Sequence, residues 1–296
     1  MYIDEGTDVL VVDENTPWPF QTNESLVILP FYGEFGHFVN SFLRQVHYLV
    51  APSKVVCCRN GEEVYFPSAT GFFYDWTDQF QPNQKVGFRD CWPPAAVFSP
   101  THEELGLLAR LRHLFPDYRL TFVAQPLRNQ QVKTMPVPIT YTSAAFPEVD
   151  VAVCCRHREW DAHRNFDRWQ FVLEPLAIQG FRIGVVGEAE TSVDFDFVTF
   201  RSWAHDCPAH GVVHALSIPR LYIGTDTGPS HLAALISRAL LLFRNEACSY
   251  LNYLTETVTV IASGRGVPVR YLQEGWTQPE RVRAAALQFL RHGTFL

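Results

Sequence analysis

The chain has 296 residues, of which 47% are hydrophobic and 19% charged, and its formal net charge at pH 7 is −7. This composition is typical of a globular protein and excludes a largely disordered chain, and the length suits two domains of roughly 150 residues. The negative charge provides no overall basic field for nucleic acid or anionic membranes. The acidic N-terminus does not resemble a signal peptide, and no run of about 18 apolar residues occurs, so we expect a cytoplasmic protein without a membrane span.

The first half of the chain predicts alternating strands and helices. Strands are expected at residues 25–31, 54–59 and 119–125, and helices at residues 36–51 and 101–115. The strands are nearly continuous apolar runs, as in a parallel sheet that is buried on both faces. In the second helix, Thr101 and Glu104 have the spacing of a capping box. The segment 60–99 is rich in aromatic residues and proline, and its fold is not predicted.

Residues 126–148 contain four prolines and no periodicity, so we predict a linker there, between an N-terminal domain (1–140) and a C-terminal domain (148–296). After it the alternation restarts. Strands are expected at residues 149–155, 181–186, 221–224, 239–243 and 257–262, and helices at residues 167–180, 202–218, 229–238 and 278–292. The last helix has Pro279 in its first turn and Gly293 after its end, and it is a candidate to pack back on the N-terminal domain.

Repeated alternation of strands and helices predicts parallel sheets with helices on both faces. Two such halves predict an α/β protein of two Rossmann-like domains that face each other across a cleft.

The seven cysteines include no C-x-x-C pair, which argues against zinc binding and against thioredoxin-like redox chemistry. Two adjacent pairs, Cys57–Cys58 and Cys154–Cys155, lie in predicted strands, where neighbouring side chains point to opposite faces. We therefore predict buried, reduced thiols. The segment 205–207 (His-Asp-Cys) lacks a convincing second pair of ligands, and we predict no metal site.

The segment 224–235, GTDTGPSHLAAL, joins a predicted strand to a predicted helix. Ligands of open parallel sheets bind at the carboxyl ends of strands, where the N-termini of helices favour anions. Gly228 would let the backbone approach an anion closely, and Pro229 suits the first helical position. Hydroxyl donors would come from Thr225, Thr227 and Ser230. The segment therefore predicts a phosphate cradle; the alternative is a plain helix that is capped by Asp226 or Thr227.

This segment resembles the D-[ST]-G-P-x-H-L-A-A signature of the heptosyltransferase-like glycosyltransferase family 9. The matching residues are Asp226, Thr227, Gly228, Pro229, His231, Leu232, Ala233 and Ala234. The resemblance implies the GT-B fold, with the acceptor on the N-terminal domain and a nucleotide-diphosphate sugar as the donor on the C-terminal domain, where this loop holds the diphosphate. It places His231 in the donor-phosphate wall rather than as a base. Asp226 would either face the donor or shape the loop through backbone hydrogen bonds.

The segments before this loop agree with the resemblance. Three arginines, Arg156, Arg158 and Arg164, follow the strand at 149–155, where the family places a basic residue against the donor phosphates. Arg164 is the closest match, and a planar guanidinium suits bidentate contact with phosphate. Glu188 or Glu190 matches the acidic residue that faces the donor ribose. The alternatives are a solvated charged loop and solvated glutamates.

The catalytic base is expected in the first domain, in the turn Gly33–Gly36 at the head of the first helix. An inverting transfer needs one base to deprotonate the acceptor hydroxyl. The resemblance favours Glu34, and His37 is the second candidate because histidine titrates near neutrality. The alternative is that Glu34 only stabilises the start of the helix.

The sequence thus predicts a glycosyltransferase that transfers a sugar to an acceptor hydroxyl, inverting and without metal or other cofactor. Arg164, the loop hydroxyls and the helix N-terminus would stabilise the leaving diphosphate. The acceptor is expected to be a glycan, a small molecule or, against the negative charge, a modified nucleic acid. The alternatives are a non-catalytic nucleotide-sugar-binding module and a nucleotide-sugar epimerase on the same fold.

Overall fold

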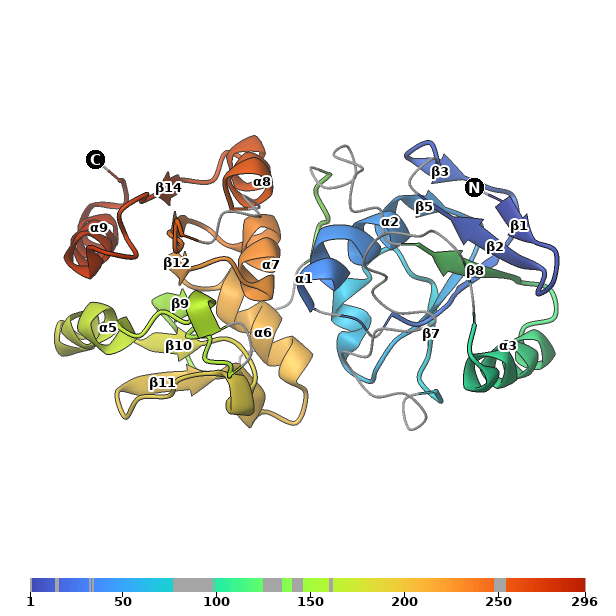
Figure 1. Ribbon diagram of the computed structural model, residues 1–296, viewed down its shortest axis with the longest axis horizontal. Coiled ribbons are helices and arrows are strands. Elements are labelled where there is room, and N and C mark those ends of the chain that lie inside the picture. Colours follow the sequence, from blue (N-terminus) through green and yellow to red (C-terminus); the bar gives the residue numbers. More distant parts are fainter. Residues whose placement is uncertain are drawn as a thin grey trace. The chain divides into compact units, whose positions relative to one another are not determined.

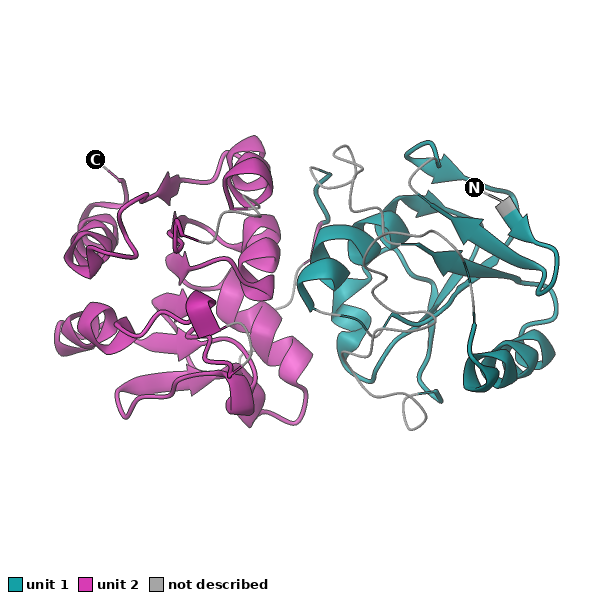
Figure 2. Cartoon of the chain, in the orientation of Figure 1, with its two compact units in different colours: residues 1–137 teal, residues 138–296 magenta. Residues whose placement is uncertain are grey.

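The structure is a computed structural model of the chain. It describes residues 2–13, 16–31, 33, 35–76, 98, 100–124, 135–139, 146–159, 162–247 and 254–295. The chain divides into two compact units, residues 1–137 (unit 1) and residues 138–296 (unit 2), which Figure 2 distinguishes by colour. Each unit is an α/β structure built on a mainly parallel six-stranded sheet, so the predicted α/β class is confirmed. Along the described ranges, no helix has the length and apolar character needed to cross a membrane.

The sheet of unit 1 is parallel except at one edge (Figure 1). Its strands, in spatial order, are β1 (Tyr2–Asp4), β2 (Val9–Val12), β8 (Arg119–Val123), β4 (Leu26–Ile28), β6 (Lys54–Cys57) and β7 (Gly71–Phe73). Only β1 pairs antiparallel with its neighbour. A separate parallel pair consists of β3 (Phe20–Gln21) and β5 (Leu49–Val50). All residues of β2 and β4 are buried, as the continuous apolar run of β4 predicted.

One face of the unit 1 sheet is covered by α3 (His102–Leu114). The predicted capping box is confirmed: the N–H of Glu104 donates to the Thr101 side chain, and the N–H of Thr101 donates to the Glu104 carboxylate. Leu107 and Leu111 of this helix belong to the same buried core cluster as side chains of β2, β4 and β8.

The helix expected at 36–51 is shorter and less regular than the sequence suggests. It consists of α1 (Phe35–His37), a π-helical turn (Phe38–Phe42) and α2 (Leu43–Tyr48). It ends at Tyr48 because Leu49 has an extended backbone (φ −76°, ψ 108°) and enters β5. The buried ammonium of Lys54 donates to the carbonyls of Val46 (2.5 Å) and Leu49 (2.7 Å), which stabilises this end of the helix.

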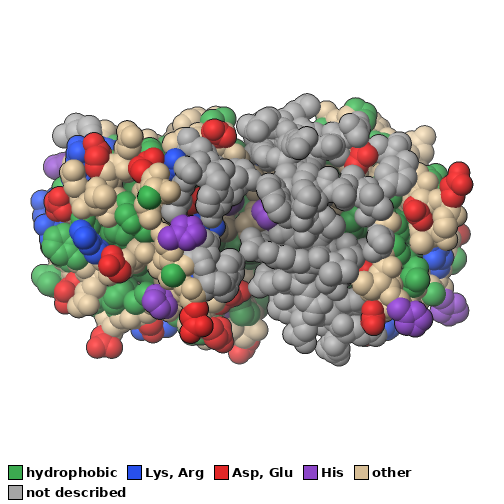
Figure 3. Space-filling model, viewed as in Figure 1, with side chains coloured by type: hydrophobic (Ala, Val, Ile, Leu, Met, Phe, Trp, Pro, Cys, Tyr) green, Lys and Arg blue, Asp and Glu red, His purple; other side chains and the backbone are tan. Residues whose placement is uncertain are grey.

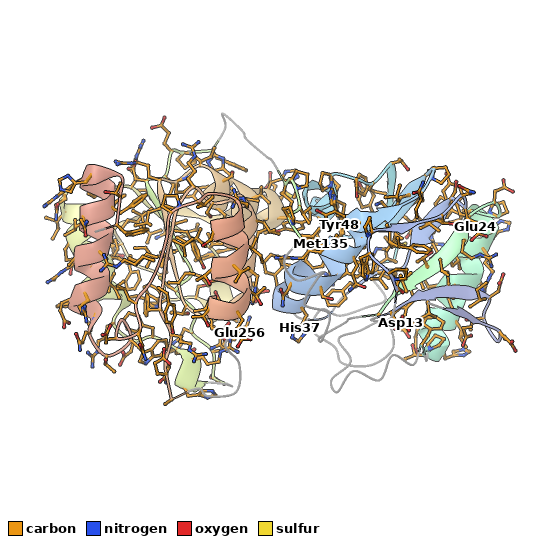
Figure 4. All side chains as sticks on the ribbon, turned by 90° about the horizontal axis from the view of Figure 1, so that it is seen from above. Asp13, Glu24, His37, Tyr48, Met135 and Glu256 are labelled. Atoms are coloured by element: carbon orange, nitrogen blue, oxygen red, sulfur yellow. The ribbon has the colours of Figure 1, made fainter. Side chains whose placement is uncertain are left out.

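Part of the predicted linker packs on unit 1. The Tyr48 hydroxyl donates to the carbonyl of Pro136 (2.6 Å), and the Arg44 guanidinium donates to the carbonyl of Met135 (3.1 Å). Figure 4 labels Tyr48 and Met135, which lie together in that view. Val137 is buried as well, so residues 135–137 are a packed segment. Of the segment 60–99, residues 77–97 and 99 lie outside the described residues.

All six strands of the unit 2 sheet are parallel. In spatial order they are β11 (Val198–Arg201), β10 (Ile183–Val185), β9 (Val151–Val153), β12 (Leu221–Gly224), β13 (Leu240–Leu242) and β14 (Val269–Tyr271). Numbered along the chain, this is the 3-2-1-4-5-6 order of a Rossmann fold. The order reverses between β9 and β12, which makes that position the topological switch point of the sheet.

Helices cover both faces of the unit 2 sheet (Figure 1). They are α5 (Trp169–Ile178), α6 (Pro208–Ser217), α7 (Gly228–Ile236), α8 (Thr259–Gly264) and α9 (Pro279–His292). The predicted last helix is confirmed, with Pro279 in its first turn and Gly293 at its end with φ 76°. Its apolar side, which includes Val282 and Phe289, belongs to the core of unit 2 together with α5, and this is where the helix packs.

The strand predicted at 257–262 is wrong. A π-helical turn (Leu254–Val258) and α8 occupy this region. The run of threonine and valine is typical of a strand, but the buried side chains of Leu254, Val258 and Ile261 recur at helical spacing. Two strands of unit 2, β11 and β14, were not predicted.

The described cysteines are free thiols. Cys57, Cys58, Cys154 and Cys155 are buried, as predicted, and burial raises the pKa of the Cys154 and Cys155 thiols. Cys91 and Cys248 lie outside the described residues. Within the described parts of the chain, no group of three or more His, Cys, Asp or Glu side chains is arranged to hold a metal ion.

Candidate functional site

The topological switch point of unit 2 lies between β9 and β12, which pair directly. Two loops begin at the carboxyl ends of these strands, at adjacent positions. The loop after Val153 contains the three arginines, and the loop after Gly224 contains the predicted phosphate cradle. In open parallel sheets, ligands bind in the crevice at this position. The two segments that the sequence singled out therefore start from neighbouring strands at the same edge of one sheet.

The loop after β12 runs directly into α7. The helix begins at Gly228 with Pro229 in its first turn, and Thr227 precedes it with an extended backbone (φ −142°, ψ 160°). The Thr227 side chain makes no capping hydrogen bond, so the alternative that Thr227 caps the helix is not what the structure shows. In the first turn of α7, Pro229 has no N–H and the N–H of Ser230 donates to the carbonyl of Thr227 at 3.1 Å, so the N–H of Gly228 and the helix dipole are the features that favour an anion there. Asp226, Gly228 and Pro229 are partly exposed at this end.

The loop hydroxyls point into unit 2 rather than out of it. The Ser230 hydroxyl is fully buried and donates to the carbonyl of Thr225 at 2.5 Å. It also lies 2.9 Å from the Tyr222 hydroxyl and 3.2 Å from that of Thr227. Thr225 and Thr227 are buried too. This arrangement differs from the expectation that the hydroxyls of Thr227 and Ser230 face a phosphate: in this structure they hold the loop.

Arg164 connects the two loops. It ends a short 3₁₀ helix (Ala162–Arg164), and its Nη2 donates to the backbone carbonyl of Asp226. The same nitrogen lies 3.6 Å from the Asp226 carboxylate, with 27% of the arginine side chain and 17% of the aspartate side chain exposed. The Asn245 side chain, after β13, donates to the carbonyl of His163 at 2.9 Å. Loops from β9, β12 and β13 are thus tied together around a partly exposed guanidinium.

The other two arginines lie in the same loop as Arg164. The loop is braced by Asn165, whose side chain accepts from the N–H of Arg158 (3.0 Å) and donates to its carbonyl (2.7 Å). Arg156 is buried and forms an isolated backbone bridge with Ser192. Arg158 and Arg164 are both half-buried, so these two of the three arginines have exposed surface for a ligand contact.

Glu188 and Glu190 lie in the turn after β10, which pairs with β9. Both are exposed, and the Glu188 carboxylate accepts from the Thr191 hydroxyl at 3.3 Å. Gly187 begins the turn: a Cβ there would lie 2.4 Å from the Ser192 hydroxyl oxygen, so a side chain does not fit. The glutamates belong to the same sheet edge as the arginine loop.

His231 lies in the first turn of α7 and is 5% exposed. Its ring is therefore an interior part of the loop–helix junction.

The sequence analysis missed a cluster at the ends of β13 and β14. The Glu246 carboxylate accepts from the Tyr271 hydroxyl at 2.5 Å and from the Arg244 guanidinium at 3.3 Å. These hydrogen bonds lower the pKa of Glu246, and the bond from Tyr271 has the larger effect, so the carboxylate is ionised near neutral pH. The available signal was the polar run Arg244–Glu246 directly after a buried apolar strand, at the edge where ligands bind.

The two candidate bases come from neighbouring positions in the sequence, just before α1 and at its end. Glu34 lies outside the described residues. His37 ends α1, shortly after the carboxyl end of β4, and is half-buried. Asp13, which was not singled out, is buried at the carboxyl end of β2, and its carboxylate accepts from the Thr16 hydroxyl at 3.3 Å. Since β2, β8 and β4 are parallel, Asp13 and His37 belong to the same edge of the unit 1 sheet, and Figure 4 labels both.

The fold defines a doubly wound α/β protein, and in its second unit the loop that contains Arg164 meets the start of α7 at the switch point. Among solved structures, the chain is similar to the ADP-heptose LPS heptosyltransferase II of E. coli, with 11% identity, a TM-score of 0.51, and coverage of 91% of this chain and 99% of that chain. This similarity confirms the heptosyltransferase type of fold that the sequence resemblance implied.

Two further similarities have lower TM-scores. A glycosyltransferase of family 9 from Veillonella parvula has 11% identity, a TM-score of 0.48, and coverage of 90% of this chain and 97% of that chain. The E. coli heptosyltransferase WaaC with ADP has 13% identity, a TM-score of 0.45, and coverage of 91% and 100%. No model of a protein family matches the sequence, and no curated protein matches it. The shared fold therefore rests on structure rather than on overall sequence similarity.

Proposed function

We propose that the chain is a glycosyltransferase that uses a nucleotide-diphosphate sugar. The observation that carries the proposal is the contact of Arg164 with Asp226 across the switch point, which joins a basic loop to an uncapped helix N-terminus. A guanidinium and helix N–H groups that converge at one place suit a diphosphate. The heptosyltransferase fold, seen in an enzyme whose name specifies ADP-heptose, supports the same class of donor.

In the proposed site, each group has a separate role. The N–H of Gly228 and the N-terminus of α7 bind phosphate oxygens. Arg164 binds the diphosphate, and Asp226 orients the Arg164 guanidinium. Glu188 or Glu190 accepts hydrogen bonds from the ribose hydroxyls. Arg156, Arg158 and His231 form the walls of the phosphate site. Pro229 starts the helix. Thr227 and Ser230 keep the loop in shape through their hydroxyls, and Thr225 does so through its backbone carbonyl.

The reaction follows from these roles. A base in unit 1, Glu34 with His37 as the second candidate, takes the proton of the acceptor hydroxyl. The acceptor oxygen bonds to the anomeric carbon as the bond from that carbon to the diphosphate oxygen breaks, which inverts the configuration. The released electron pair stays on the diphosphate, where Arg164 and the α7 N-terminus stabilise the negative charge without a metal ion.

The acceptor we propose is a glycan or a small molecule. The chain has a net charge of −7. On the face of unit 2 that Figure 3 shows, the basic side chains are scattered among acidic ones and form no single basic patch. A nucleic-acid acceptor would need such a patch, and strong weakening of binding by salt would indicate it.

The proposal is tested first by binding. Isothermal titration with ADP, UDP and GDP in EDTA should give a measurable affinity for one of them, and Arg164→Ala should weaken it roughly 10- to 100-fold, because a hydrogen bond to a charged group is lost. Arg220→Ala is the matched control, since Arg220 is an exposed guanidinium before the opposite, amino end of β12. Absence of binding by all nucleotides, or equal losses in both variants, would contradict the donor site.

Transfer is tested by release of the nucleoside diphosphate when a nucleotide sugar and candidate acceptors are added. Glu34→Gln should stop release while leaving nucleotide affinity unchanged. If the protein instead converts the nucleotide sugar alone into another sugar, it is an epimerase. If it binds the nucleotide sugar but neither transfers nor converts it, the chain is a binding module.

A further inference from the structure

Tyr222 is an unusual residue for the centre of a parallel strand that is buried on both faces. It is 1% exposed, and its neighbours in β12 are the apolar residues Leu221 and Ile223. Its phenol ring extends along the strand toward the carboxyl end. Gly224, two residues on and therefore on the same face, leaves room for it: a Cβ at Gly224 would lie 2.4–2.6 Å from the Cε1, hydroxyl and Cζ atoms of Tyr222.

The Tyr222 hydroxyl forms a hydrogen bond with the Ser230 hydroxyl, and the other partner of Ser230 determines which of the two donates. A carbonyl oxygen only accepts, so the single hydroxyl hydrogen of Ser230 goes to the carbonyl of Thr225. The 2.9 Å contact between Tyr222 and Ser230 must then be a donation from the tyrosine to the serine oxygen. Burial raises the pKa of Tyr222, so the phenol keeps its proton. A relay therefore runs from Tyr222 through Ser230 to the backbone of Thr225.

This relay closes the loop that the proposed function assigns to the diphosphate. Ser230 is in the first turn of α7, and Thr225 is the first residue after β12, so the bond between them holds the two ends of the segment 225–230 together. Thr227 adds a third side chain, with its hydroxyl 3.2 Å from that of Ser230. The shape of the segment determines where the first-turn N–H groups and Asp226 point.

We propose that Tyr222 is a positioning residue for the diphosphate site: its hydroxyl, through Ser230 and Thr225, fixes the loop that binds the donor without touching the ligand. This inference rests on the proposed function, because it assumes that the segment 225–231 binds a diphosphate. It assigns a role in binding to a side chain in the interior of the sheet.

The test compares hydroxyl deletions that differ only in where the hydroxyl acts. Tyr222→Phe keeps the ring and removes the oxygen. Ser230→Ala removes the second member of the relay. Ser237→Ala is the matched control: Ser237 is the residue at the other end of α7, is 1% exposed, and donates to the carbonyl of Leu216 at 2.7 Å. All three variants lose a buried hydroxyl bond and should lose similar stability.

The affinity of each variant for the nucleoside diphosphate that the wild type binds is measured by titration, together with amide hydrogen exchange of residues 225–231. Tyr222→Phe and Ser230→Ala should each weaken binding on the order of tenfold and speed exchange in this segment, as loss of a buried hydrogen bond that shapes the site would. Ser237→Ala should bind as the wild type does.

If Tyr222→Phe and Ser230→Ala bind the nucleoside diphosphate as tightly as Ser237→Ala does, the positioning role is refuted and the proposed function stands. If all three weaken binding equally, the effect is one of general stability, and the inference is again refuted. If the wild-type chain binds no nucleoside diphosphate, the proposed function fails and the inference fails with it. Should Tyr222→Phe not fold, Ser230→Ala and its control give the same decision.

Discussion

Gly224 offers a direct test of how the strand and the loop fit together. In the substitution Gly224→Ala, the new Cβ would lie 2.4 Å from Cε1 and 2.5 Å from the hydroxyl oxygen of Tyr222, whereas ordinary contacts begin near 3.4 Å. The ring must therefore retreat by about 1 Å, which lengthens the contact of its hydroxyl with Ser230 from 2.9 Å to at most roughly 3.9 Å and weakens or breaks the hydrogen bond. Crowding costs about 1–3 kcal/mol. The lost buried hydrogen bond costs about 1–3 kcal/mol more, so the total is roughly 2–6 kcal/mol.

A double-mutant cycle with Tyr222→Leu isolates the cause. Without the phenol ring, Gly224→Ala should cost less than about 1 kcal/mol, because alanine loses less backbone entropy than glycine on folding. Native-state hydrogen exchange of the β12 and α7 amides reports the free energy of unfolding of unit 2 by itself. A coupling energy below about 0.5 kcal/mol between the two substitutions would refute the steric argument, since independent sites add to within that range.

Two further predictions concern pH. Burial lowers the pKa of Lys54 from 10.5 to about 8, so between these pH values the unfolded chain keeps a proton that the folded chain has released. The free energy of unfolding should therefore rise with pH in this range, by up to roughly 3 kcal/mol relative to Lys54→Met. Urea titrations of both proteins at pH 8 to 10 measure the difference. Burial also lowers the pKa of His214 below 6.5, so acid should destabilise the wild type more than His214→Phe between pH 6.5 and 5, with parallel curves as the contradicting result.

Much of unit 2 could be predicted because its sequence signals are local. The strand before Thr225, the glycine and proline at the start of α7, and the basic run to Arg164 each specify one element. Parallel pairing then places them at one edge without further information. The contact between Arg164 and Asp226 joins residues 62 positions apart, and only the strand order brings it about.

The errors have physical causes too. Residues 257–262 alternate threonine and valine, which strands favour, yet tertiary packing at helical spacing overrides that preference. The short strands β11 and β14 carry polar residues such as Thr199 and Arg270, so they lack the continuous apolar run of the central strands. The cluster of Arg244, Glu246 and Tyr271 depends on a strand that was not predicted.

The loop after β12 shows what a motif leaves open about its own residues. A serine or threonine beside a helix N-terminus can donate to a bound anion or to the protein, and the two roles need the same residue types. What decides between them here is outside the motif: Tyr222, in the preceding strand β12, reaches over Gly224 and directs Ser230 inward. The hydroxyls then hold the loop, so the proposed anion binding depends on the N-terminus of α7 and on Arg164. A donor site of this kind should tolerate loss of the Thr225 hydroxyl better than loss of the Tyr222 hydroxyl, although only the threonine lies in the loop.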